Sequence, residues 1–83
     1  EYQMLASLLK EARKRRGLTQ EQVAAKLNKP RSFPHKVENA ERELNVIELM
    51  DYCEALGEDF LNFVVSFSVS VREFRLQNSS NSV

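Results

Sequence analysis

The side chains in this sequence that are best suited to binding chemistry are cations, and most of them lie in its first half. Residues 1–42 contain ten Lys or Arg against five Asp or Glu, whereas residues 43–83 contain two against seven. The formal net charge of zero therefore hides a segregation into +5 and −5. Clustered guanidinium and ammonium groups bind polyanions, although a run such as residues 10–16 is also typical of a solvated helix face.

Side chains that could carry catalysis are too few to form a catalytic set. The sequence has one His and one Cys, no glycine-rich phosphate loop and no cluster of metal ligands. It also has no pair of cysteines for a disulfide, no signal peptide and no apolar run of the roughly 20 residues that span a bilayer. We therefore predict a cytoplasmic protein that is not an enzyme, lies in no membrane and needs no metal or cofactor.

Short helices must position these cations. Leu5, Leu8, Leu9 and Ala12 have the spacing of an amphipathic helix, which predicts a helix over residues 3–16. Further helices are predicted over 20–27, over a short segment ending near 39 or 40, and over 46–56, with a brief helical turn at 60 and 61. Cys53 lies within the apolar stripe of the 46–56 helix, which indicates core packing rather than a reactive thiol.

Capping residues predict where the helices begin and end. Thr19 with Gln22, and Asn45 with Glu48, have the spacing of a capping box at a helix start. Residues that tolerate positive φ are predicted to close the preceding helices: Gly17, Asn28 and Gly57.

The last third of the chain has a different pattern. Apolar residues alternate with serines, the period of two that is typical of a strand; they are Phe63, Val65, Phe67, Val69 and Val71. We predict a strand over 63–72, within a segment 63–76 that pairs with a second copy, because a lone strand leaves its backbone unpaired and its apolar ridge in water. A helical stripe through Phe60, Phe63, Val64 and Phe67 is the alternative. Residues 77–83 are predicted to be a disordered tail.

Residues 3–62 resemble the lambda-repressor and Cro family, the XRE-type helix-turn-helix proteins. The resemblance rests on Gly17-Leu18-Thr19-Gln20-Glu21, on Ala24 at a helix crossing, on Lys36-Val37-Glu38-Asn39 and on Ala55-Leu56-Gly57. It implies an all-α, five-helix DNA-binding domain over residues 1–62, to which the predicted β-strand adds a dimerisation segment. It also implies a bacterial or phage-encoded transcriptional regulator, a repressor that binds a palindromic operator in double-stranded DNA as a homodimer.

The resemblance further implies which residues touch DNA. In such proteins the second helix of the motif lies in the major groove, and its outward positions here are Arg31, Ser32, His35 and Lys36. An arginine can pair bidentately with guanine O6 and N7, and a serine can donate or accept. Phosphate contacts, which grip without reading sequence, are expected from residues around this helix: Thr19, Gln20, Lys29, Asn39 and Arg42.

Pro34 departs from the family pattern, which has a branched apolar residue in the reading helix at this position. A proline inside a helix would cost about 3 kcal/mol. We therefore expect the helix to begin late, with Ser32 as its N-cap and Pro34 in its first turn, which would move Arg31 out of the helix.

Two further expectations concern the end of this helix. Ala40 replaces the glycine that is common after the Glu-Asn pair, so we expect Asn39 to adopt the left-handed conformation. Glu38 is expected to form an interhelical ion pair with Arg13, for which Glu21 is an alternative partner.

A second function on the same fold stays open at this point. The chain could be an antitoxin or adaptor that binds a protein partner of unknown identity, with DNA contact secondary or lost because of Pro34. Salt-dependent binding to duplex DNA distinguishes the two roles, because phosphate neutralisation makes affinity fall steeply as salt rises.

Overall fold

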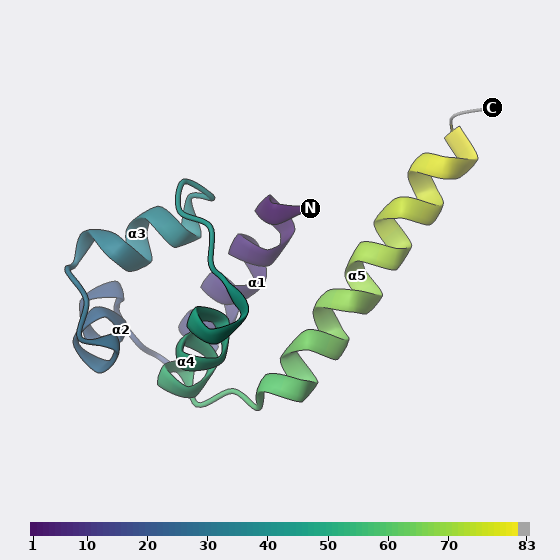
Figure 1. Ribbon diagram of the computed structural model, residues 1–83. Coiled ribbons are helices and arrows are strands. Elements are labelled where there is room, and N and C mark those ends of the chain that lie inside the picture. The colour runs from purple at the N-terminus through teal and green to yellow at the C-terminus, as the bar shows by residue number, and fades with distance from the viewer. Residues whose placement is uncertain (82–83) are drawn as a thin grey trace.

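Five α-helices make up the regular structure of residues 1–81, the part of the chain that the computed structural model describes. They are α1 (Tyr2–Arg15), α2 (Gln20–Leu27), α3 (Ser32–Glu38), α4 (Val46–Leu56) and α5 (Phe60–Asn81). Helices α1 to α4 form one cluster, and α5 packs against α1 and α4 before its C-terminal end stands clear of them (Figure 1). The all-helical class and the first four predicted helices are confirmed.

Side-chain caps fix the starts of α2 and α4. The Thr19 hydroxyl accepts a hydrogen bond from the Gln22 backbone N–H at 3.0 Å, and the Gln22 side chain accepts one from the Thr19 backbone N–H at 2.9 Å. Asn45 and Glu48 repeat this arrangement at 2.8 and 3.0 Å. Such caps contribute about 1 kcal/mol each, so both predicted capping boxes are confirmed.

The chain reverses after α3 at a residue other than the one predicted. Asn39 has φ −92°, and Ala40 adopts the left-handed conformation at φ 59°. The backbone N–H of Glu41 donates to the Lys36 carbonyl at 2.8 Å, and that of Ala40 donates to the Val37 carbonyl at 3.1 Å. This pair of bonds defines a Schellman turn, which requires the positive φ at Ala40 although alanine adopts it at a cost of about 1 kcal/mol.

The core lies where α1, α2, α3 and α4 meet, and the first half of α5 closes one side of it. Its fully buried members include Leu9, Val23, Val37, Cys53 and Leu56. Burial raises the pKa of the Cys53 thiol to about 11, so the thiol stays protonated at neutral pH. The sulfur therefore acts as a small apolar group, as its place in the sequence stripe predicts.

Tyr52 is the largest of the fully buried side chains, and its hydroxyl has no hydrogen-bond partner among the described residues. Burial raises the pKa of this phenol well above its usual value, so the hydroxyl is neutral. A buried hydroxyl without a partner costs about 1 to 3 kcal/mol. We expect Tyr52→Phe to raise the free energy of unfolding by about 1 kcal/mol in urea denaturation followed by circular dichroism; a loss of similar size would contradict this.

The predicted C-terminal strand is wrong, because residues 63–72 lie in α5 and residues 1–81 contain no strand. The alternating pattern comes from two helical stripes whose members are four residues apart and offset by two. Phe63 and Phe67 belong to the stripe that packs on the core, whereas Val65 and Val69 belong to a stripe that stays exposed. Packing of the first stripe on α1 and α4 outweighs the β propensity of the valines. The Asp59 carboxylate also caps the helix by accepting the Asn62 backbone N–H at 2.9 Å.

The predicted strand-paired dimer is lost with the strand. Of its five interface residues, Phe63 is buried, Phe67 and Val71 are half-buried, and Val65 and Val69 are exposed, so they share no single face. The segment predicted as a tail continues in α5 as far as residue 81, and residues 82 and 83 lie outside the described part of the chain. None of the helices within residues 1–81 combines the length and apolar composition needed to cross a membrane.

Candidate nucleic-acid interface

The turn between α2 and α3 fixes how the two helices meet. Asn28 ends α2 in the left-handed conformation with φ 55°, as predicted, and the Lys29 backbone N–H donates to the Ala24 carbonyl at 2.9 Å. The Phe33 backbone N–H donates to the Pro30 carbonyl at 2.9 Å, so the chain enters α3 at once. Ala24 is buried, and its small side chain lets the two helices approach closely. The result is a rigid helix-turn-helix unit.

Pro34 is the third residue of α3 and is buried. Because the first-turn N–H groups of a helix have no intrahelical acceptor, the proline leaves no helical hydrogen bond unmade. The prediction that the helix begins late enough to accommodate Pro34 is therefore correct. Ser32, however, is the first helical residue rather than the N-cap, and the flanking Arg31 makes no side-chain capping bond.

The residues predicted to contact bases lie together on one exposed side of α3, which we call the α3 face: Arg31, Ser32, His35 and Lys36. The His35 ring Nε2 lies 3.1 Å from the Asn39 side-chain nitrogen. The Arg31 side chain is 80% exposed, and its Nε lies 3.8 Å from a carboxylate oxygen of Glu21, which is also exposed. An exposed pair at this separation is worth little, so Arg31 can leave Glu21 for another partner at small cost.

A buried ion pair fixes the inner side of α3. The Glu38 carboxylate accepts hydrogen bonds from Arg13 Nε at 2.6 Å and Nη2 at 3.1 Å, and from the Gln20 side-chain nitrogen at 3.0 Å. Arg13 also donates to the Leu18 carbonyl at 2.7 Å. The hydrogen bond to Glu38 raises the pKa of the Arg13 guanidinium further. The predicted Arg13–Glu38 pair is confirmed, whereas the alternative partner Glu21 lies beside Arg31.

The two residues predicted to bind phosphate at the start of α2 both have structural roles. The hydroxyl of Thr19 is the acceptor of the capping box, and Thr19 is exposed. Gln20 is half-buried because its side-chain nitrogen reaches inward to Glu38. The network thus holds the N-terminus of α2 against α3, and both phosphate contacts remain predictions.

The predicted phosphate ligands Lys29 and Arg42 both lie over the ring of Phe33. Lys29 Nζ is 5.5 Å and Arg42 Cζ 5.3 Å from the centroid of Phe33. Arg42 also pairs with the Glu48 carboxylate at 2.6 Å, which raises the pKa of Arg42 and lowers that of Glu48. The charge of Arg42 is therefore already offset within the protein. The sequence identified Glu48 only as a capping residue, and its second role had no separate signal.

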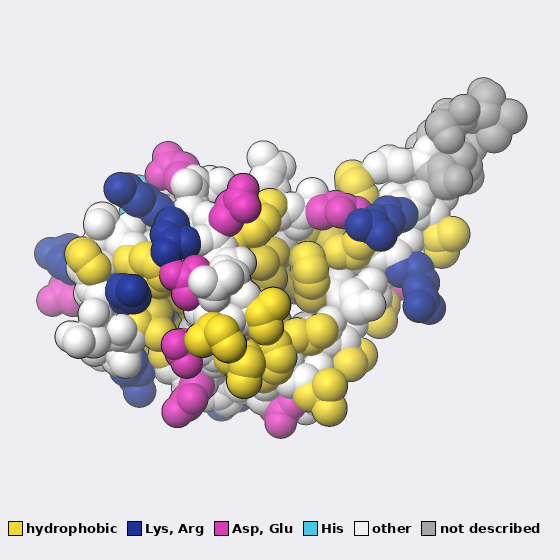
Figure 2. All heavy atoms as spheres, viewed as in Figure 1, with side chains coloured by type: hydrophobic (Ala, Val, Ile, Leu, Met, Phe, Trp, Pro, Cys, Tyr) yellow, Lys and Arg dark blue, Asp and Glu magenta, His cyan; other side chains and the backbone are white. Residues whose placement is uncertain are grey.

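The basic run at the end of α1 is in part structural. Arg13 points into the Glu38 network, and Arg15 and Arg16 both contact the Glu58 carboxylate, at 2.8 and 3.4 Å. On the side shown in Figure 2, most Lys and Arg side chains lie at the end of the molecule formed by α2 and α3. The cations without a strong carboxylate partner near the α3 face are Lys29, Arg31 and Lys36.

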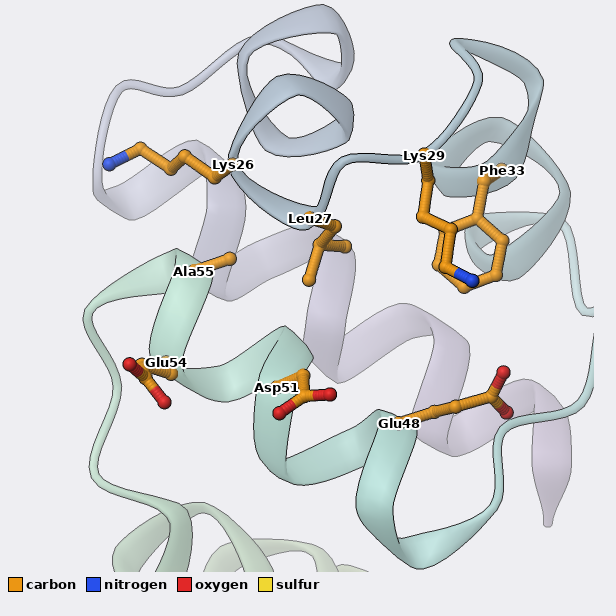
Figure 3. Close-up of a pocket in the computed structure, with 8 residues that line it drawn as sticks. All are labelled: Lys26, Leu27, Lys29, Phe33, Glu48, Asp51, Glu54 and Ala55. Atoms are coloured by element: carbon orange, nitrogen blue, oxygen red, sulfur yellow. The ribbon is translucent and has the colours of Figure 1, made fainter.

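An open groove of about 430 Å³ separates this end of the molecule from α4. Lys26 and Lys29 lie on its α2 side, and three carboxylates line its α4 side: Glu48, Asp51 and Glu54. Leu27 points between the two walls, and Lys29 lies along Phe33 (Figure 3). The three carboxylates make the α4 side of the groove repulsive to anions.

Comparison with known proteins gives a consistent result. A helix-turn-helix family model, HTH_3, matches residues 9–62. An XRE-family like protein from Pseudomonas syringae pv. tomato str. DC3000 has 46% sequence identity and a TM-score of 0.79, over 83% of this chain and 84% of that one. Among proteins with curated descriptions, none matches this sequence.

Two further solved structures share the fold. They are the Restriction-Modification Controller Protein C.Esp1396I, as wild type and as a point mutant, at 23% and 24% identity and a TM-score of 0.77 each. Each alignment covers 84% of this chain, and 92% and 89% of the respective controller protein. The matched region contains α2, α3 and the buried Arg13–Glu38 pair. The chain therefore belongs to the XRE-type helix-turn-helix family of DNA-binding transcriptional regulators.

Proposed function

We propose that the chain is a sequence-specific repressor that reads double-stranded DNA with the α3 face. The observation that carries the proposal is that α3 has one exposed polar side and one side fixed to the core. Its exposed side presents four polar side chains, whereas Val37 and Glu38 fix its other side to the core. A single α-helix fits the major groove, where every base pair presents a distinct pattern of donors and acceptors. In this proposal a bound copy represses transcription by blocking access to the same stretch of DNA.

The side chains of the α3 face have separate roles in this proposal. Arg31, free to leave Glu21, donates two hydrogen bonds to a guanine. Ser32 and His35 donate to or accept from neighbouring base edges, and Lys36 donates to guanine or to a phosphate. The contacts to the phosphate backbone of DNA come from the surrounding residues Thr19, Gln20, Lys29 and Asn39. Arg42 contributes only if it contacts a phosphate while it remains paired with Glu48.

The operator is proposed to be a palindrome bound by two copies. A recognition helix of seven residues contacts only a few base pairs, so one copy discriminates weakly among sequences. Two copies related by a two-fold axis place their α3 helices in successive major grooves, about 34 Å apart. The binding free energies of the two half-sites then combine.

Selection of the full chain against random duplexes tests the proposal. We expect enrichment of one palindromic sequence, with an affinity that falls steeply as salt rises from 50 to 200 mM, as phosphate neutralisation requires. No enrichment, together with no duplex binding at low salt, would overturn the proposal and favour a protein-binding role of the same fold.

Replacing Lys29 distinguishes contacts to the phosphate backbone from contacts that recognise bases. We expect Lys29→Ala to weaken binding to the selected operator and to unrelated duplexes by the same factor, and to reduce the slope of log affinity against log salt by about 1 per half-site. Lys10→Ala, which removes an exposed cation of α1, is the matched control and should leave both quantities unchanged. A Lys29→Ala effect confined to the operator would show that Lys29 reads bases.

A further inference from the structure

His35 lies on the α3 face and carries the single imidazole of the sequence. It follows Arg31 by one helical turn and precedes Asn39 by another, and residues four apart are neighbours on the surface of a helix. The side chain is exposed. Histidine is the residue that ordinarily gains or loses its charge between about pH 5 and pH 8. The charge of the α3 face can therefore depend on pH at this position.

The contact with Asn39 requires a neutral ring in the free protein. The ring Nε2 lies 3.1 Å from the Asn39 side-chain nitrogen. Because an amide nitrogen donates and does not accept, Nε2 must be the acceptor, which leaves the proton of the neutral ring on Nδ1. A protonated ring has a donor at each nitrogen, so it cannot keep this contact. Asn39 in this orientation is therefore a partner of the neutral form alone.

The charges around His35 do not favour a second cation in the free protein. Arg31 and Lys36 are exposed cations on the same α3 face, and the Glu38 carboxylate points inward to its own partners. The charged residues of other segments that contact α3 or its N-cap are Arg13 of α1, Glu21 of α2, Lys29 of the turn before α3, and Glu41 and Arg42 of the segment after it. No carboxylate among residues 1–81 forms an ion pair with the His35 ring.

We propose that His35 contacts DNA as an imidazolium, so that each copy of the chain takes up a proton when its α3 face binds the operator. The inference rests on the proposed function of α3. DNA presents acceptors to this face, namely guanine N7 and O6 in the major groove and the phosphate oxygens. A protonated ring donates a charge-assisted hydrogen bond to such an acceptor, which is stronger than a neutral one.

Two further features make the bound state suitable for the charged ring. The phosphates of the duplex offset the repulsion that Arg31 and Lys36 exert on a third cation. His35 also lies in the last turn of α3, where the helix dipole favours a positive charge. The free protein thus favours the neutral ring with its Asn39 contact, and the complex favours the protonated one.

The sign of the pH dependence follows from this difference. Because binding of the proton and binding of DNA favour each other, affinity for the operator falls as pH rises through the range in which the bound ring is protonated and the free ring is neutral. Below that range both states are protonated, and above it both are neutral, so affinity levels off on either side. An opposite charge in contact changes the proton affinity of a side chain by about tenfold or more. The expected change in DNA affinity is therefore about tenfold per half-site.

The affinity of the full chain for the selected operator, measured at constant salt from about pH 8.5 down to about pH 5.5, tests the proposal. We expect the wild type to gain about tenfold per half-site over this range. His35→Gln is the matched control, because glutamine can donate and accept but binds no proton; its profile should be flatter than that of the wild type. A wild type whose affinity does not change with pH, or a His35→Gln protein with the same pH profile, overturns the proposal. Urea denaturation at both ends of the range shows whether each protein is folded.

NMR titration of the ring observes the proton directly, because one histidine gives one set of imidazole signals. We expect the ring to lose its proton at a higher pH with the operator bound than without it, and identical titrations would overturn the proposal. Selection at about pH 6 and about pH 8 then identifies the acceptor: a guanine gained at the lower pH assigns it to a base, and an unchanged sequence assigns it to a phosphate. Absence of duplex binding at every pH defeats the proposed function as well, whereas pH-independent binding to a selected operator defeats the inference about His35 alone.

Discussion

Glu38→Ala is expected to lower the free energy of unfolding by about 3 to 5 kcal/mol, a large share of the total stability of a domain of this size. The Glu38 side chain is only 2% exposed and that of Arg13 only 11%. Removing the carboxylate leaves the Arg13 guanidinium buried with a single acceptor among residues 1–81, the Leu18 carbonyl, and frees the Gln20 side chain as well. Because the pair joins α1 to α3, its loss should also release the recognition helix.

Urea denaturation followed by circular dichroism measures this loss, and two further variants interpret it. Glu58→Ala removes the partner of Arg15 and Arg16 in an exposed contact and should change stability by less than about 1 kcal/mol. The double variant R13M/E38L should recover most of the lost stability, because apolar side chains of similar volume need no partner. A Glu38→Ala protein as stable as Glu58→Ala would show that the pair does not hold α3.

Arg31→Ala is expected to weaken binding to the selected operator by about 1 to 3 kcal/mol per half-site, or roughly 5- to 150-fold. A repeated selection should show that the preference for one base pair in each half-site has relaxed, because a bidentate contact to guanine has been removed. Folding stability should not change, since the side chain is 80% exposed and its contact with Glu21 is weak.

Lys10→Ala is again the control, because it removes one exposed positive charge from α1 rather than from the α3 face. If Arg31→Ala and Lys10→Ala have the same affinity and the same base preferences, Arg31 contributes only charge. A loss of affinity for Arg31→Ala that is equal on all sequences would reassign Arg31 to the phosphate backbone.

Much of the first 60 residues could be predicted because the local signals agree with one another. Thr19 and Asn45 each occur three residues before a side chain that completes a capping box, and left-handed residues close the helices that they follow. Such signals depend on residues that are close in the sequence, so tertiary packing does not alter them. The position of Pro34 in the first turn of α3 could be predicted for the same reason, since the restriction on proline is local.

The structure of α5 could not be predicted because a strand and a helix with two apolar stripes give the same sequence pattern. Residues four apart on two sides of a helix, offset by two, produce the same alternation as one face of a strand. Only the contacts of Phe63 and Phe67 with the core decide between them, and part of this core is supplied by α1, more than forty positions away in the sequence. The β propensity of Val65 and Val69 also favoured the strand, which is the wrong prediction.

The candidate site was predicted more completely in its exposed residues than in its ion pairs. The α3 face follows from helix periodicity once α3 is placed. The pairing of Arg42 with Glu48, and of Arg15 and Arg16 with Glu58, depends on loops whose course no sequence pattern specified. Three cations of the basic first half therefore have carboxylate partners from the acidic second half. The apparent segregation of charge along the chain is partly reversed in three dimensions.

The most direct test of the central claim, that α3 reads bases, is a titration of the ¹⁵N-labelled full chain with the selected operator and with a scrambled duplex of equal length. We predict that the backbone amides of residues 31–36, with the proline at 34 excluded, shift with the operator in a way the scrambled duplex does not reproduce, while the amides of Asp51 and Glu54 stay unchanged. Identical shifts with the two duplexes, or operator-specific shifts confined to α4 and α5, would contradict the account.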